Sequence, residues 1–191
     1  MLGRSRSWRP RPLSPGHHDT GAPLTPTGTR KSPISTQGGL SQGRTSETAA
    51  VIITSVVDGD TVRVDDRHGR DLGRIRLLGI NASELAHDGI SAQCWAEQAR
   101  ARLAELTPIG ATVHLVADPT QVDRDNYGRL LRYVLVDDVD VQHVLLAEGQ
   151  VRAFWPKSPG LHAANYLAAA QQAEHDQRGL WASCTNRKDP S

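Results

Sequence analysis

The sequence has few aromatic residues, no long apolar run and no strong excess of charge. Aromatic residues make up 4% of the chain, and its formal net charge is +1. No segment approaches the ~20 consecutive apolar residues that cross a bilayer, so we expect no membrane partner. Nucleic-acid-binding domains are often strongly basic. A broad positive field is excluded here, and any phosphate binding has to come from a few placed arginines.

Cysteine is also scarce, since only Cys94 and Cys184 are present. Neither lies in a Cys-x-x-Cys or Cys/His spacing typical of zinc sites. An even count permits one disulfide, whereas two buried free thiols would fit a cytosolic protein. Residues 1–30 contain arginines but no apolar core after them, so we do not expect a conventional secretory signal there.

Charge is unevenly distributed along the chain. Residues 1–49 carry a net charge of +5, and residues 50–191 carry −4. Residues 1–48 are rich in Pro, Gly, Ser, Thr and Arg and lack apolar periodicity, which predicts a disordered tail. Such a basic tail either has no role or adds weak attraction to nucleic acid. We expect the folded domain at 49–184 and a short C-terminal tail at 185–191.

Hydrophobic periodicity predicts strands and helices within that domain. Strands are expected at 50–57, 62–64, 72–80, 112–117 and 130–136. A helix is expected after Ser91 as N-cap, ending before Pro108. A short helix at 141–145 and a last helix from Ser158 through Gln177 follow. The pattern is α+β, with an antiparallel sheet that can close as a small barrel.

Three short polar segments carry most of the chemical information. They are Val57–Thr61 (VDGDT), Arg74–Glu84 (RIRLLGINASE) and Asp125–Arg129 (DNYGR). Carboxylate oxygens bind divalent cations, arginine forks bind phosphate oxygens, and a further carboxylate can activate water. Together these residue types are suited to cutting a phosphodiester with the help of a hard metal ion.

These segments, followed by Arg178-Gly179-Leu180-Trp181, resemble the thermonuclease family of staphylococcal-nuclease-like domains over about residues 50–182. The resemblance implies an OB-fold, a five-stranded antiparallel β-barrel with three α-helices. It also implies a calcium-dependent nuclease that hydrolyses DNA and RNA to products with 3′-phosphate ends. We expect such a protein to be a monomer.

The resemblance assigns roles to the residues at matching positions. The implied catalytic residues are Arg76 and Arg129, which bind the scissile phosphate, and Glu84, the general base. The implied calcium ligands are Asp60, Asn81 and the backbone carbonyl of Ala82. Alternatives remain for the calcium ligands and for the catalytic residues: Asp60 could be a turn residue only, and Arg76 could form a structural ion pair.

Two positions in the Asn81–Glu84 segment depart from the family pattern. Asn81 stands where the family usually has a second ligand aspartate, and Ser83 replaces a common proline. Because calcium affinity follows the number of charged ligands, Asn81 predicts weaker calcium binding than a two-aspartate site has.

Three further residues are candidates for contact with substrate. Tyr127 lies in the Tyr-Gly-Arg turn, where it either shapes the turn or contacts substrate. Trp155 stands near a family tyrosine beside the nucleotide; it could stack on a base or fill the core. Lys157 is a weaker candidate for a phosphate contact.

Some exported members of the family that this chain resembles have cysteines near both positions. The resemblance therefore favours a Cys94–Cys184 disulfide and an extracytoplasmic or secreted protein, with a cytoplasmic location as the alternative. The main alternative to the nuclease is a catalytically weak or inactive nucleic-acid-binding module on the same fold, since Asn81 and the acidic domain both reduce binding of metal or phosphate.

Overall fold

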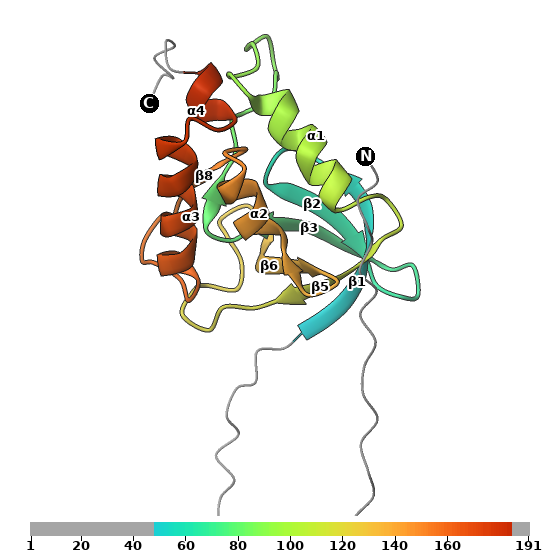
Figure 1. The fold of residues 1–191 in the computed structure, drawn as a ribbon. Helices are drawn as coiled ribbons and strands as arrows, with labels where there is room; N and C mark the ends of the chain where they lie inside the picture. Colours follow the sequence, from blue (N-terminus) through green and yellow to red (C-terminus); the bar gives the residue numbers. More distant parts are fainter. Residues whose placement is uncertain (1–47, 185–191) are drawn as a thin grey trace, which may run out of the picture. The chain divides into compact units, whose positions relative to one another are not determined.

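Five strands close on themselves into a barrel in the computed structural model, which describes residues 48–184 (Figure 1). The barrel strands are β1 (Thr48–Val56), β2 (Thr61–Asp65), β3 (Asp71–Leu77), β5 (Thr112–Val116) and β6 (Leu130–Val136). They are ordered β3-β2-β1-β5-β6, and a pairing of β3 with β6 completes the ring. The two predicted tails lie outside the described residues, apart from Thr48, with which β1 begins.

The closing pair is the one parallel pair among these five strands. β3 and β6 run in the same direction, with Ile75 opposite Leu130 and Arg76 opposite Leu131. The other neighbours are antiparallel. A long crossover separates β3 from β6, which permits parallel pairing. The expected α+β OB-fold barrel is confirmed, but its sheet is mixed and not wholly antiparallel.

Alternation along β2 and β3 sorts side chains between core and surface. Val62 and Val64 are buried on β2, and Ile75 and Leu77 are buried on β3. Because successive side chains of a strand point to opposite faces, Arg74 and Arg76 share the outer face of β3.

The predicted strand over 72–80 is interrupted at Gly79, which has φ +75°. A Cβ at this position would lie 2.8 Å from Cδ2 of Tyr166, so both the backbone angle and the space favour glycine. The chain turns here into β4 (Ile80–Asn81), which pairs with β8 (Arg152–Ala153) in a separate small sheet. A further short strand, β7 (Val139–Asp140), pairs with β6.

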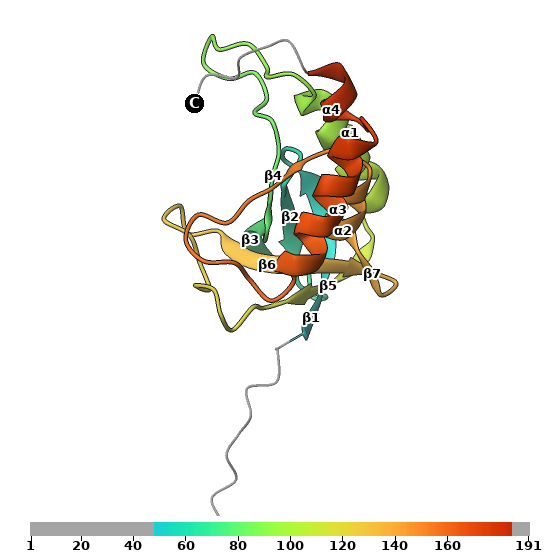
Figure 2. The same ribbon diagram turned by 60° about the vertical axis from the view of Figure 1, so that its left-hand side comes forward.

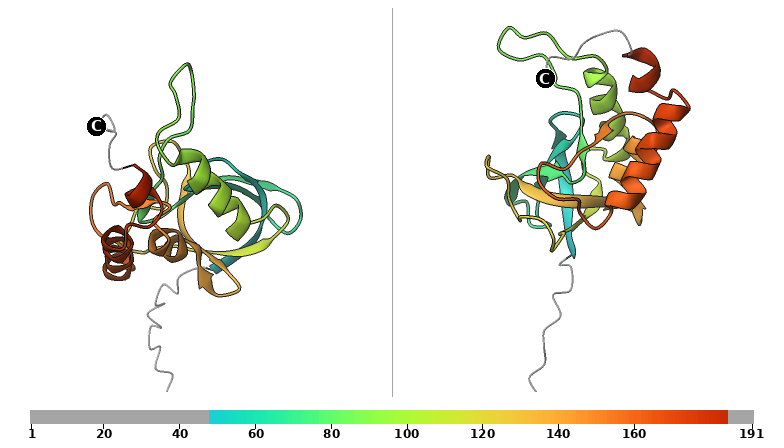
Figure 3. Two further views of the ribbon diagram at one scale, coloured as in Figure 1. Left: turned by 45° about the horizontal axis from the view of Figure 1, so that its top comes forward. Right: turned by 90° about the vertical axis from the view of Figure 1, so that its left-hand side faces the viewer.

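Helices cover one end and one side of the barrel. α1 (Ala96–Leu106) lies across the barrel end, as Figure 3 shows. α2 (Val141–Ala147) and α3 (Ala163–His175) lie side by side (Figure 2). A one-turn helix, α4 (Leu180–Ser183), is present in addition to the three that were expected.

Two predicted helix starts are wrong, because tertiary contacts hold the preceding residues in other conformations. α1 does not begin after Ser91; it follows Trp95, whose φ is +73° and whose indole nitrogen donates to Gln150 Oε1 at 2.8 Å. α3 does not begin at Ser158. The backbone N–H of Leu161 donates to the Asp118 carboxylate at 2.9 Å, which holds this segment against the barrel.

Cys94 and Cys184 form a disulfide, with 5.9 Å between their Cα atoms. The expected pairing is confirmed, and the alternative of two free thiols is wrong. The bond links the residues before α1 to the end of α4. Within residues 48–184, none of the helices is both long and apolar enough to span a membrane.

Candidate active site

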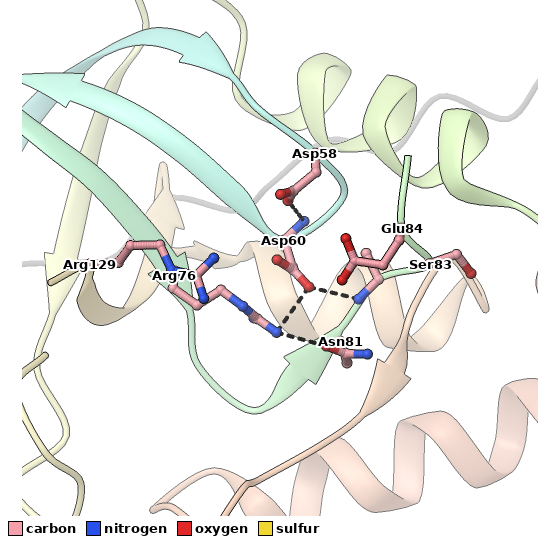
Figure 4. Close-up of a pocket in the computed structure, with 8 residues that line it drawn as sticks. Asp58, Asp60, Arg76, Asn81, Ser83, Glu84 and Arg129 are labelled. Carbon is pink, nitrogen blue, oxygen red and sulfur yellow. Dashed lines mark hydrogen bonds and ion pairs between the residues drawn. The ribbon is translucent and has the colours of Figure 1, made fainter. Parts of the chain in front are cut away.

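A small polar cavity of about 120 Å³ lies where the three polar segments meet (Figure 4). Its lining residues are Asp58, Asp60, Arg76, Asn81, Ala82, Ser83, Glu84 and Arg129. The fold thus brings together all six residues that the sequence suggested as catalytic or metal-binding.

The turn between β1 and β2 presents Asp60 to this cavity. Asp58 Oδ1 accepts a hydrogen bond from the backbone N–H of Asp60 at 2.9 Å, a local bond typical of aspartate in turns. A Cβ on Gly59 would lie 2.7 Å from the Cβ atoms of Ala82 and Ala99. Only glycine lets the turn pack this closely against α1 and the Ala82 segment.

Asp60 is almost fully buried, with 6% of its surface exposed. Its Oδ2 accepts from the backbone N–H of Ala82 at 2.8 Å and contacts Arg76 Nη2 at 3.0 Å. Burial raises the pKa of Asp60 to about 6, and the Arg76 guanidinium opposes that rise. An additional cation beside the carboxylate would favour its ionised form.

Arg76 spans the floor of the site from the outer face of β3. Its Nη1 donates to the carbonyl of Leu77 at 2.7 Å, and its Nη2 donates to Asn81 Oδ1 at 3.0 Å. The ion pair with Asp60 was the alternative interpretation of this residue, and the structure contains it. The pairing also orients the guanidinium at the cavity, so the two interpretations are compatible.

Arg129 reaches the same cavity from the turn that precedes β6. Asp125 shapes this turn by accepting from the backbone N–H groups of Tyr127 and Arg129, and its carboxylate contacts Arg129 Nε at 2.7 Å. The parallel β3–β6 register brings the turn beside Arg76, and Figure 4 shows the two arginines next to each other. Two adjacent guanidinium groups are suited to binding one phosphate.

Glu84 is exposed on the opposite side of the cavity, and its carboxylate faces Asp60 (Figure 4). No hydrogen bond or ion pair to this carboxylate is found among the described residues. The backbone of Glu84 is held by Gln93, which accepts from its N–H at 2.8 Å and donates to its carbonyl at 2.9 Å. Sequence reasoning missed Gln93, because no local pattern links it to Glu84.

The oxygen donors in the cavity fit a hard cation. Asp60 offers a carboxylate and Asn81 an amide oxygen, ligand types that calcium and magnesium prefer. Within residues 48–184, however, no group of three or more His, Cys, Asp or Glu side chains is placed to hold a metal ion. Any metal here would be held by a mixed set of charged and neutral oxygens, consistent with Asn81 supplying no charge.

The model of the family described as "Staphylococcal nuclease homologue" matches residues 74–183, which is more than half of the chain. The chain belongs to the staphylococcal nuclease homologue family. The match begins at Arg74 within β3 and covers the Asn81–Glu84 segment, the turn at Arg129 and the last helices.

Named relatives of this staphylococcal nuclease homologue agree with that assignment. "Endonuclease YncB" of Bacillus subtilis is 32% identical over 141 residues, 72% of this chain and 65% of that protein. "SPbeta prophage-derived endonuclease YokF" of the same organism is 31% identical over 137 residues, 71% of this chain and 45% of its own length. "Thermonuclease" of Staphylococcus intermedius is 28% identical over 131 residues, which are 68% of this chain and 74% of that protein. The chain spans about two thirds of the length of YncB and under half of the length of YokF.

The three candidate substrate contacts lie in different places in this staphylococcal nuclease homologue. Tyr127 is 86% exposed, and the Arg129 guanidinium lies 5.4 Å from its ring centroid. Trp155 is half-buried against Tyr166, with 6.3 Å between the ring centroids. Neither Trp155 nor Lys157 lines the cavity at Asp60. The packing of Trp155 favours the core-filling alternative.

Proposed function

We propose that this protein is a calcium-dependent nuclease that hydrolyses DNA and RNA to products with 3′-phosphate ends. The observation that carries the proposal is the convergence of Arg76, Arg129 and Glu84 on one cavity beside the buried carboxylate of Asp60. Relatives named endonuclease and thermonuclease support the same class of reaction.

Arg76 and Arg129 would bind the scissile phosphate. The transition state of phosphodiester hydrolysis gains negative charge on the equatorial oxygens of phosphorus. Two guanidinium groups held in place before the reaction stabilise that charge more than they stabilise the ground state. The existing contacts to Asp60 and Asp125 keep both side chains oriented without help from the substrate.

Glu84 would take the proton of the attacking water. Its carboxylate is exposed, faces the cavity and has no partner among the described residues, so it is free to accept a proton. Attack of this water on phosphorus breaks the bond to the 5′ oxygen. The phosphate stays on the 3′ oxygen of the upstream fragment, and the 5′ oxygen takes up a proton and leaves as the hydroxyl of the downstream fragment.

Asp60, Asn81 and the carbonyl of Ala82 are the groups that would hold calcium. Calcium held there would lower the pKa of the attacking water and would polarise a phosphate oxygen. Asn81 contributes an oxygen without a charge, so we expect binding weaker than in a two-carboxylate site.

We further propose that the protein is an extracytoplasmic monomer. The Cys94–Cys184 disulfide supports that setting, because such bonds persist in oxidising compartments. A cytoplasmic location is the alternative, and there we expect the two thiols to be reduced.

Digestion of single-stranded DNA by the purified protein, in calcium and in EDTA, tests the nuclease. Glu84→Gln and Arg129→Ala should each lower the rate by roughly 10²- to 10³-fold, because each removes one catalytic group. Glu97→Gln and Arg100→Ala are matched controls on the exposed face of α1, and both should cleave as the wild type does.

The second candidate function, a binding module without activity, is favoured by Asn81 and by the net charge of −4 on residues 50–191. Binding of DNA without cleavage at millimolar calcium would establish it. Absence of both binding and cleavage would contradict both proposals.

A further inference from the structure

A second, larger cavity of about 540 Å³ adjoins the candidate active site. It is lined by Arg74, Glu84, Tyr127, Gly128 and Arg129. Glu84 and Arg129 also line the first cavity, so the two cavities adjoin at these residues. A substrate phosphate held between Arg76 and Arg129 therefore leaves room for the next part of the same molecule beside Arg74.

Arg74 is positioned by the same strand that positions Arg76. The two residues are two positions apart on β3, so their side chains share the outer face of the barrel at a spacing of about 6.6 Å along the strand. That distance is on the scale of one nucleotide step along an extended single strand.

The charge of Arg74 is not compensated by any residue that the structure describes. Among the described residues, nearby arginines are paired: Arg63 with Asp71, Arg76 with Asp60, and Arg129 with Asp125. Arg74 makes no ion pair or hydrogen bond with any described residue.

Glu84 is the one carboxylate that lines the second cavity, against the two guanidinium groups of Arg74 and Arg129. The lining therefore carries a net positive charge, although the domain as a whole is acidic. An anion is the ligand that such a lining attracts.

We propose that Arg74 binds a second phosphate, the neighbour of the scissile phosphate on the same nucleic-acid strand. This inference rests on the proposed nuclease function and adds to it a further residue that binds the polynucleotide substrate. A single phosphodiester would engage only Arg76 and Arg129. Tyr127 lines the same cavity with its ring exposed, so a base attached to the second phosphate has an aromatic face within reach.

The test compares Arg74→Ala with Arg67→Ala. Arg67 is also exposed and without a partner among the described residues, but it lies on the β2–β3 hairpin and lines neither cavity. Each protein is assayed on a single-stranded oligonucleotide and on bis-(p-nitrophenyl) phosphate, which has one phosphodiester. Oligonucleotide affinity is measured separately by fluorescence anisotropy in the Glu84→Gln background, over a range of salt concentrations.

For Arg74→Ala we expect selectivity, the ratio of kcat/KM on the oligonucleotide to that on the single diester, to fall roughly tenfold. Oligonucleotide affinity should fall by a similar factor, and its dependence on log salt should become shallower by about one unit. Arg74→Lys should recover the salt dependence, because it restores the charge. Arg67→Ala should match the wild type in all three measurements.

The outcomes separate this inference from the proposed function. If the wild type cleaves DNA and Arg74→Ala keeps its selectivity and affinity, the second phosphate site is wrong and the nuclease stands. If the wild type cleaves neither substrate but Arg74→Ala binds the oligonucleotide more weakly than Arg67→Ala does, the nuclease is wrong and the phosphate site stands. An equal loss in Arg74→Ala and Arg67→Ala would overturn the site in favour of general charge attraction.

Discussion

The two sides of the candidate active site are held in different ways. Asp60, Arg76 and Arg129 form a barrel wall, fixed by strand pairing and by ion pairs among largely buried groups. Glu84 forms a loop wall, since it lies on the segment between β4 and α1, with an exposed side chain. Gln93 holds its backbone, and the disulfide at Cys94 lies one residue further along.

Because of this difference, we expect substitutions in the barrel wall to lower stability and substitutions in the loop wall to lower activity. Charges in the barrel wall partner one another in a low-dielectric setting, so removing one leaves another uncompensated. The carboxylate in the loop wall has no partner among the described residues, so we expect its replacement to lower activity and to leave stability nearly unchanged. Functional groups on loops are typically supported in this way by a rigid scaffold.

Among the substitutions that test the difference between the two walls, removal of the disulfide should have the largest effect. It closes a loop with a sequence separation of 90 residues, so the double variant Cys94→Ser, Cys184→Ser should lose ~4–5 kcal/mol of unfolding free energy in the chain-entropy model. Urea denaturation of both proteins measures the loss. We also expect lower nuclease activity in the variant under conditions where it is still folded, because Gln93 loses its anchored neighbour. Full activity in the folded variant would show that the loop wall does not depend on the bond.

Asp60→Ala should destabilise the barrel wall by about 3 kcal/mol, because it leaves Arg76 and the N–H of Ala82 without their buried acceptor. Thermal or urea unfolding without metal measures this change. Glu105→Ala removes a carboxylate from an exposed ion pair with Arg102 and should cost about 0.5 kcal/mol or less. Glu84→Gln should likewise change stability little. Equal losses in Asp60→Ala and Glu84→Gln would remove the distinction between the walls.

Gln93→Ala should lower kcat by roughly 10- to 100-fold, since Glu84 would no longer be held in place and small displacements of a catalytic group are costly. Oligonucleotide affinity should stay near that of the wild type, because Gln93 does not line either cavity. Single-turnover kinetics and anisotropy measure the two quantities. Gln172→Ala, an exposed change on α3, is the control. A loss of affinity as large as the loss of kcat would point to general unfolding of the loop instead of positioning.

Asn81→Asp should give the smallest effect, a calcium affinity higher by about fivefold, because it adds a charged oxygen ligand beside Asp60. Isothermal titration with calcium measures it. The added carboxylate would also attract Arg76, which already donates to Asn81 Oδ1 at 3.0 Å, and this competition limits the gain. An unchanged calcium affinity would contradict the expected role of position 81 as a metal ligand.

Local sequence signals predicted the parts of the fold that depend on local physics. The Asp58-Gly59-Asp60 turn, the alternation along β2 and the turn before Arg129 each follow from residues close in sequence. The closing disulfide and the site residues followed from the family resemblance. The resemblance assigned catalytic roles to Arg76, Glu84 and Arg129. The three residues line one cavity, which is consistent with those roles, and the roles stay predictions.

The failures lie where distant contacts override local signals. Ser91 has the side chain of a helix cap, but the hydrogen bonds between Gln93 and Glu84 hold its segment outside the helix. Ser158-Pro159 has the pattern of a helix start, but Asp118 binds the chain at Leu161 instead. Gln93 and the uncompensated charge of Arg74 have no local signature, because each depends on residues brought close only by the fold.

The parallel pairing of β3 with β6 also bears on how this protein tolerates change in length. Ile75 lies opposite Leu130, so the neighbouring positions of Arg76 and Arg129 are set by a ladder of backbone hydrogen bonds. The chain between them contributes little to that spacing. Insertions at an exposed turn between them, such as 87–90, should therefore lengthen the protein without moving the two arginines apart.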